Sequence, residues 1–78
     1  MTNYKYHYRQ QNHAALQQLL QWAGSPAELA RIAGVNRSTV TYWESQGKIS
    51  REGAIAIAKF PGSPLTAAEI RSDIKVWK

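Results

Sequence analysis

The sequence contains no cysteine, only two histidines and only five acidic residues among its 78 positions. The absence of cysteine excludes a disulfide scaffold, a Cys-ligated zinc finger, an iron–sulfur site and a thiol nucleophile. The two histidines, His7 and His13, are not at the spacing of helical metal ligands. No pairing of a nucleophile with a base and no phosphate-binding loop is found. The sequence therefore predicts a protein that is not an enzyme and needs no metal or other cofactor.

Long apolar runs are also missing. No stretch approaches the roughly 20 apolar residues that cross a bilayer. The first residues, from Met1 to Tyr6, lack the apolar segment of a secretory signal. We therefore expect a cytoplasmic protein with no membrane partner.

Charge and size point to the class of partner. Ten Lys and Arg against five Asp and Glu give a formal net charge of +5, and hydrophobic residues make up 44% of the chain. That hydrophobic content is close to the globular average, which disfavours a disordered polycation. A chain of this length forms one small domain that buries about 60% of the surface of its unfolded form. The balance of charge favours a polyanionic partner, with nucleic acid or an anionic membrane face first.

Residues 1–11 are predicted to be a separate basic segment, because three tyrosines alternate with basic side chains over Tyr4–Arg9. Alternation with a period of two suggests a strand or an extended arm. Three interpretations stay open: a strand that pairs with residues 74–77, an arm that becomes ordered on DNA, and a disordered segment. The main domain is expected at 12–73 and a short C-terminal tail at 74–78.

Five short helices are expected in the main domain, so the fold class is all-α, with short terminal strands as an added option. The first helix starts at a cap, Asn12, and its apolar positions are Leu16, Leu19, Leu20 and Ala23. Capping boxes begin the second helix at Ser25 and the fifth at Thr66, where Leu65 and Ile70 form a hydrophobic staple. The third follows Asn36 and ends at Gly47, and the fourth follows Ser50. Residues 54–58 alternate and also fit a strand, and Gly53 would cost a helix about 1 kcal/mol.

The second and third helices form the most informative unit. They are joined at Gly34, where a glycine allows a positive φ. Ala30 is small enough for the next helix to pass over it, and Val40 and Trp43 anchor that helix to the core. Two short helices joined by a tight glycine turn are typical of a helix-turn-helix.

The segment SPAELARIAGVNRSTVTYWE, residues 25–44, resembles the helix-turn-helix of the lambdoid phage Cro and repressor family and of the related YdaS-like antitoxins. Similarity to the YdaS-like group extends from about Leu16 to Asp73. The resemblance implies a five-helix DNA-binding domain and a phage-type or prophage-type transcriptional repressor. Such a protein binds an operator through the helix at about 36–46, often as a dimer. One departure is Leu19, where the repressor branch has an arginine that pairs with a glutamate at the position of Glu44.

The outer side of the third helix carries the residues expected to contact double-stranded DNA. Recognition helices contact base edges mainly through their N-terminal residues, and arginine can bind guanine with two hydrogen bonds. The candidates for base or groove contact are Arg37, Ser38, Thr41 and Tyr42. The candidates for phosphate contact are Ser25, Arg31, Ser45, Lys48 and Arg51. Ser25 is included because a helix N-terminus binds anions through free N–H groups.

Other interpretations remain. The polar side of the third helix also fits an ordinary solvated surface. A YdaS-like antitoxin with a toxin partner, or a helical protein–protein adaptor, is the main alternative function. A MerR-like winged domain is suggested by residues 41–44 followed by Gly47, Lys48 and Ile49, but no wing hairpin follows, so it ranks low.

Overall fold

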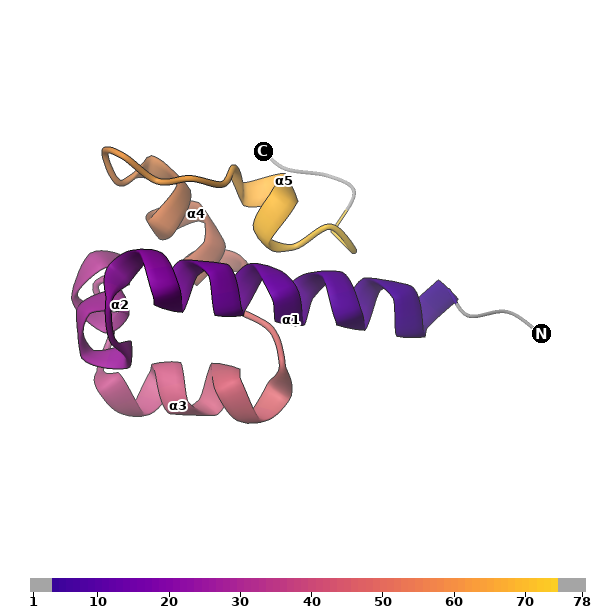
Figure 1. The fold of residues 1–78 in the computed structure, drawn as a ribbon, viewed down its shortest axis with the longest axis horizontal. Coiled ribbons are helices and arrows are strands. Elements are labelled where there is room, and N and C mark those ends of the chain that lie inside the picture. The colour runs from indigo at the N-terminus through magenta and orange to yellow at the C-terminus, as the bar shows by residue number, and fades with distance from the viewer. Residues whose placement is uncertain (1–3, 75–78) are drawn as a thin grey trace.

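Residues 4–74 form an array of five α-helices (Figure 1). The computed structural model describes the backbone of residues 4–74 and the side chains of residues 11–74. The helices are α1 (Tyr4–Ala23), α2 (Pro26–Ala33), α3 (Arg37–Gln46), α4 (Arg51–Lys59) and α5 (Ala67–Ile70). Residues 4–74 contain no strand. The all-α, five-helix prediction is confirmed, and the added option of terminal strands is wrong for these residues.

The first helix is longer than the sequence pattern suggested. α1 runs for 20 residues from Tyr4, so the strand or extended arm predicted for residues 4–11 is wrong. A helix already nucleated by packing extends at little cost, because each added residue gains one backbone hydrogen bond. Asn12 is consequently not a cap; it lies inside α1 and is only 4% exposed. Of the segment proposed as its strand partner, residues 75–77 lie outside the described residues.

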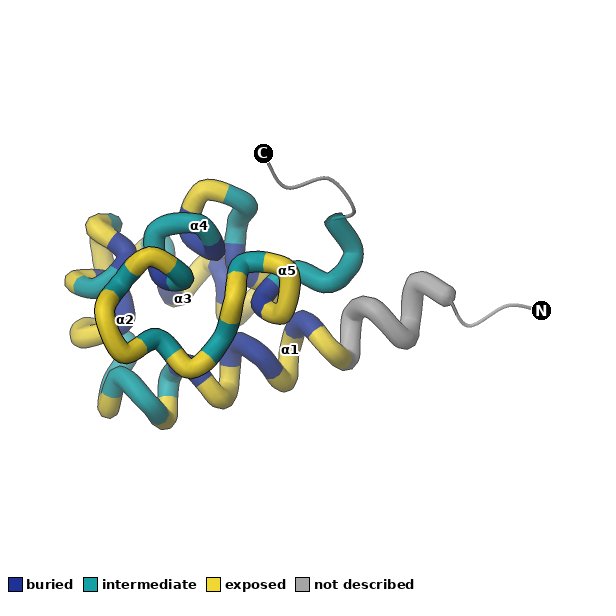
Figure 2. The backbone as a smooth tube through the Cα atoms, turned by 90° about the horizontal axis from the view of Figure 1, so that it is seen from above, coloured by how far each residue is buried: buried dark blue, intermediate teal, exposed yellow. Residues whose placement is uncertain are grey.

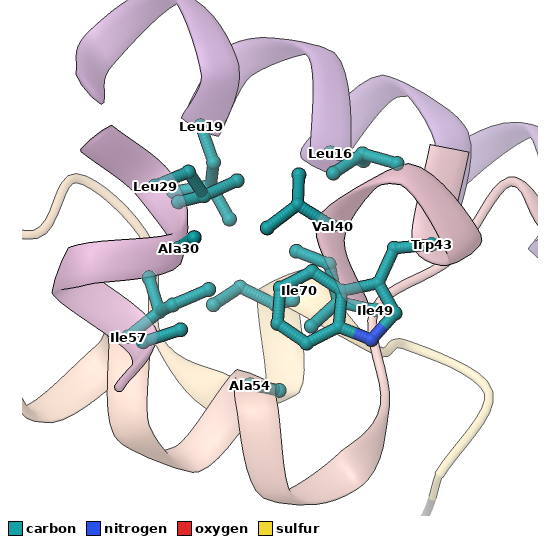
Figure 3. Close-up of a cluster of buried hydrophobic side chains, with 11 residues drawn as sticks. Leu16, Leu19, Leu29, Ala30, Val40, Trp43, Ile49, Ala54, Ile57 and Ile70 are labelled. Atoms are coloured by element: carbon teal, nitrogen blue, oxygen red, sulfur yellow. The ribbon is translucent and has the colours of Figure 1, made fainter. Parts of the chain in front are cut away.

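The core lies where the five helices and the α3–α4 loop meet (Figure 3). Leu16, Leu19, Leu29, Ile57 and Ile70 are fully buried there. α2 packs against α1, α3 and α4, while α5 packs against α1 and α4. The alternation at 54–58, which also fitted a strand, is part of the continuous helix α4. The two helices of the predicted motif are therefore held by the core of the whole domain.

Gly53 lies where α4 packs tightly against Trp43 of α3 and against Ile49. A Cβ atom built there would lie 2.6 Å from Cζ2 of Trp43 and 2.9 Å from Cγ2 of Ile49. Trp43 is 2% exposed and Ile49 1% exposed. The glycine costs α4 some helix propensity, but it lets the first turn of α4 pack directly against the indole ring. This packing fixes α3 through its tryptophan.

The predicted helix ends are largely confirmed. The hydroxyl of Thr66 accepts from the N–H of Glu69 at 3.2 Å, and the Glu69 carboxylate accepts from the N–H of Thr66 at 2.8 Å. At α2 only half of the expected box is present. The Ser25 hydroxyl accepts from the N–H of Glu28 at 3.2 Å, but the Glu28 carboxylate accepts from Arg31 instead. Asn36 occupies the N-cap position of α3 and makes no side-chain cap bond.

A polar clamp joins the C-terminal turn to the rest of the fold. Arg71 donates two hydrogen bonds to the Asp73 carboxylate, at 2.8 and 2.7 Å, and a third to the carbonyl of Ile49 at 2.9 Å. Asn12 donates to Asp73 at 3.0 Å, and its own side-chain oxygen accepts from the N–H of Ser72 at 3.2 Å. Arg71 holds the pKa of the Asp73 carboxyl well below its usual range, and the bond from Asn12 lowers it further. The sequence predicted an extended or frayed tail from Asp73 onward, but in the structure Ser72 and Asp73 form a turn.

No helix within residues 4–74 combines the length and the apolarity that crossing a membrane requires.

Candidate nucleic-acid interface

The turn between α2 and α3 sets the direction in which α3 leaves the core. Gly34 has φ +74°, in the left-handed region that glycine adopts readily. Its N–H donates to the carbonyl of Arg31 at 3.2 Å, and the N–H of Val35 donates to the carbonyl of Ala30 at 2.9 Å. These bonds satisfy the last carbonyl groups of α2. The positive φ expected at Gly34 is thus confirmed, and α2 ends where the motif requires.

One side of α3 is buried and the opposite side is exposed. Val40 is 0% exposed and Trp43 2% exposed, and both belong to the core cluster. At about 100° per residue, the outer face of α3 is made by Ser38, Thr41, Tyr42 and Ser45, all of which are exposed. Tyr42 is 61% exposed, the largest exposure of a large hydrophobic side chain within residues 11–74. The structure thus brings the predicted base-contact and groove-contact residues onto one surface, with Arg37 at its N-terminal end.

Two hydroxyl groups of this outer face already donate hydrogen bonds to backbone carbonyl groups of α3. Thr41 donates to the carbonyl of Arg37 at 3.3 Å, and Ser45 donates to the carbonyl of Tyr42 at 2.7 Å. Such bonds to the preceding turn are common for Ser and Thr within helices. Each hydroxyl oxygen keeps lone pairs for an outside donor, and a rotation about one bond frees its proton. The face can therefore accept hydrogen bonds from base edges as it stands, and can donate after a small rearrangement.

The predicted phosphate site at the start of α2 has fewer free N–H groups than the sequence led us to expect. Pro26 has no N–H, and the N–H of Glu28 donates to Ser25. Ser25 is half-buried, and the Glu28 carboxylate adds a negative charge to this turn. Arg31 lies 2.7 Å from that carboxylate, in an ion pair whose side chains are 65% and 49% exposed. Exposed pairs of this kind contribute about 0–1 kcal/mol, so exchanging Glu28 for a phosphate costs Arg31 little.

Of the other three phosphate candidates, Ser45 lies on the outer face of α3, and two lie past the C-terminal end of that helix. Lys48 is exposed and follows Gly47, which ends α3 with φ +75°. Arg51 is half-buried and is the first residue of α4. Glu44 is exposed on α3, near the edge of the outer face that carries Arg37. All nine predicted contact residues fall in the sequence segment from Ser25 to Arg51.

The polar clamp is the feature that sequence reasoning missed. Asn12 and Asp73 are 61 residues apart in the chain, and neither belongs to a local motif that predicts the other. The nearest sequence signal is the pair Arg71 and Asp73, two residues apart. In the part of the chain that the structure describes, no group of three His, Cys, Asp or Glu residues could hold a metal ion.

Comparisons of this chain with protein-family models, with curated proteins and with solved structures find no match. The resemblance to the Cro and repressor family therefore stays a prediction from residues 25–44, and that to the YdaS-like group a prediction from residues 16–73.

Proposed function

We propose that this protein binds double-stranded DNA in a sequence-specific way through the outer face of α3, and regulates transcription as a repressor. The observation that carries the proposal is the division of α3 into two sides. Val40 and Trp43 anchor one side in the core, while Ser38, Thr41 and Tyr42 line the opposite, exposed side. An α-helix presented in this way fits the major groove, which is about 12 Å wide.

The residues divide into two roles. Arg37 is at the N-terminal end of α3, the end from which recognition helices contact base edges. Its guanidinium can donate two hydrogen bonds to one guanine, while the Thr41 methyl suits the methyl group of thymine. Arg31 and Lys48, on either side of α3 in the chain, are suited to phosphates. Phosphate contacts position the protein, and contacts with base edges supply the specificity.

The experiment is a selection from randomised duplexes followed by affinity measurements. We expect the wild-type protein to enrich one short sequence, and the variant Ser38→Ala/Thr41→Ala/Tyr42→Ala to lose that enrichment. At about 1 kcal/mol for each lost hydrogen bond, the loss is about 3 kcal/mol, or roughly 100-fold in affinity.

A matched control replaces three exposed polar residues of α1. The variant Gln17→Ala/Gln18→Ala/Gln21→Ala also changes an exposed helix surface, and it should keep the wild-type enrichment. Thermal unfolding of both triple variants shows whether each is folded. A wild-type protein that enriches no sequence, or an α3 variant with the wild-type profile, would refute the proposal.

The alternative is a protein–protein module, either an adaptor or an antitoxin. It is favoured by the 61% exposure of Tyr42, since tyrosine is enriched at protein interfaces, and by the opposite charges of Arg37 and Glu44 on α3. A pure adaptor binds no duplex. Titration of labelled duplex at low salt distinguishes the two functions.

A further inference from the structure

The two charged side chains of α3 are both placed against the helix dipole. Arg37 is the first residue of α3, and Glu44 lies in its last turn. The N-terminal end of a helix carries a partial positive charge and the C-terminal end a partial negative charge. Each side chain is therefore at the end whose partial charge has its own sign. The stability of α3 does not explain why these two residues are there.

The fold does not compensate for this placement. Within residues 11–74, the side chains of Arg37 and Glu44 are exposed and make no hydrogen bond or ion pair. Glu28 of the preceding helix, in contrast, pairs with Arg31 at 2.7 Å. α3 therefore presents one group that only donates hydrogen bonds and one that only accepts them, and both are available to a ligand.

The two groups lie along one edge of the outer face of α3. Seven residues of helix bring Glu44 to within about 20° of the direction of Arg37 and about 10 Å further along the axis. The exposed Thr41 lies between them on the same side. Successive base pairs of B-DNA are about 3.4 Å apart. If α3 lies along the groove, the two charged groups therefore reach base pairs about three steps apart.

The major groove offers a different partner to each group. Guanine has two acceptors, O6 and N7, and the Arg37 guanidinium can donate to both of them. Cytosine has the N4 amino group, which can donate to the Glu44 carboxylate, whereas thymine has the acceptor O4. Adenine has an amino group too, but the acceptor N7 lies beside it. A carboxylate without a donor in the groove is repelled by the phosphates, so Glu44 favours cytosine and disfavours the other bases.

We infer that the DNA sequence bound by this protein contains two G·C pairs about three base steps apart, in which Arg37 binds the guanine of one pair and Glu44 the cytosine of the other. The inference rests on the proposed function and makes Glu44 a residue that determines specificity. The carboxylate acts mainly by weakening binding to duplexes that lack this cytosine, since specificity is a difference between two affinities.

The test is the selection from randomised duplexes, performed with the wild-type protein and with Glu44→Gln. The wild type should enrich two G·C pairs about three steps apart. Glutamine pairs with adenine through N6 and N7, so Glu44→Gln should shift one position from cytosine towards adenine and keep the guanine bound by Arg37. Replacing that C·G pair by T·A should weaken wild-type binding roughly 10-fold and should leave binding by Glu44→Ala nearly unchanged.

The matched control is Glu69→Gln, which removes the same charge from α5. Glutamine can also accept from the N–H of Thr66, so the capping box is kept. In Figure 1, α5 lies above α1 and α3 lies below it, so the view from above in Figure 2 looks onto α5. This variant should keep the wild-type sequence preference. Thermal unfolding shows whether each variant is folded, and Glu44→Gln should not lower Tm, because it removes a charge that opposes the dipole.

The outcomes separate the inference from the function on which it rests. A wild-type sequence preference for Glu44→Gln would overturn the inference while DNA binding through α3 stood. The same shift in Glu69→Gln would also overturn it, because the effect would then come from net charge alone. A selected sequence without the two G·C pairs would do so as well. A wild-type protein that enriched no sequence would overturn the proposed function itself.

Discussion

Replacing Gly53 by alanine tests the packing that holds α3. In an ordinary helix interior, this change would stabilise the protein by about 0.8–1.0 kcal/mol, because alanine loses less backbone entropy. Here the new Cβ would lie 2.6 Å and 2.7 Å from two carbon atoms of the Trp43 ring and 2.9 Å from Cγ2 of Ile49. Overpacking of a core costs about 1–3 kcal/mol. We expect a net loss of about 1 kcal/mol.

The assay is thermal unfolding followed by circular dichroism. For a domain of this size, a loss of 1 kcal/mol lowers Tm by about 4–8 °C. Gly53→Ala should therefore lower Tm although it raises helix propensity. In a Trp43→Phe background, the ring no longer has the two atoms nearest the new Cβ, but Cγ2 of Ile49 remains 2.9 Å away. The same change should therefore lower Tm by less in that background than in the wild-type protein. A higher Tm for Gly53→Ala in the wild-type protein would refute the close packing of α4 against Trp43.

Three further predictions concern the turn, the clamp and the outer face of α3. Gly34→Ala should cost about 1–2 kcal/mol, because Gly34 has φ +74° with nothing within 4 Å of an added Cβ; an unchanged Tm would contradict this. Arg71 holds the pKa of Asp73 below its ordinary 3.8, so the ionised carboxylate stabilises the fold above about pH 4 and this contribution is lost as the pH falls further. Asp73→Asn should lower Tm at pH 7 and reduce the decline of Tm between pH 4 and 2; an identical decline would argue against the clamp. Arg37→Ala should cost about 1–3 kcal/mol on the selected duplex and relax one or two base preferences, whereas Arg31→Ala should weaken all sequences equally; matching preference profiles for wild type and Arg37→Ala would make Arg37 a phosphate contact.

Interactions between near neighbours in the chain could be predicted from the sequence. Ser25 and Thr66 cap their helices through a residue three positions away, and Gly34 ends α2 through bonds to the preceding turn. The buried side of α3 follows from the spacing of Val40 and Trp43 alone, because helix geometry places residues three apart on one side. The outer face of α3 could be predicted for the same reason.

The features that the sequence did not predict depend on contacts between residues far apart in the chain. Asn12 resembles a helix cap in the sequence, but it lies within α1, and its amide pairs with Asp73, 61 residues away. Gly53 resembles a defect in α4, but its missing side chain makes room for Trp43. Local helix propensity cannot predict these contacts, because the free energy of each contact depends on groups that only the folded chain brings together.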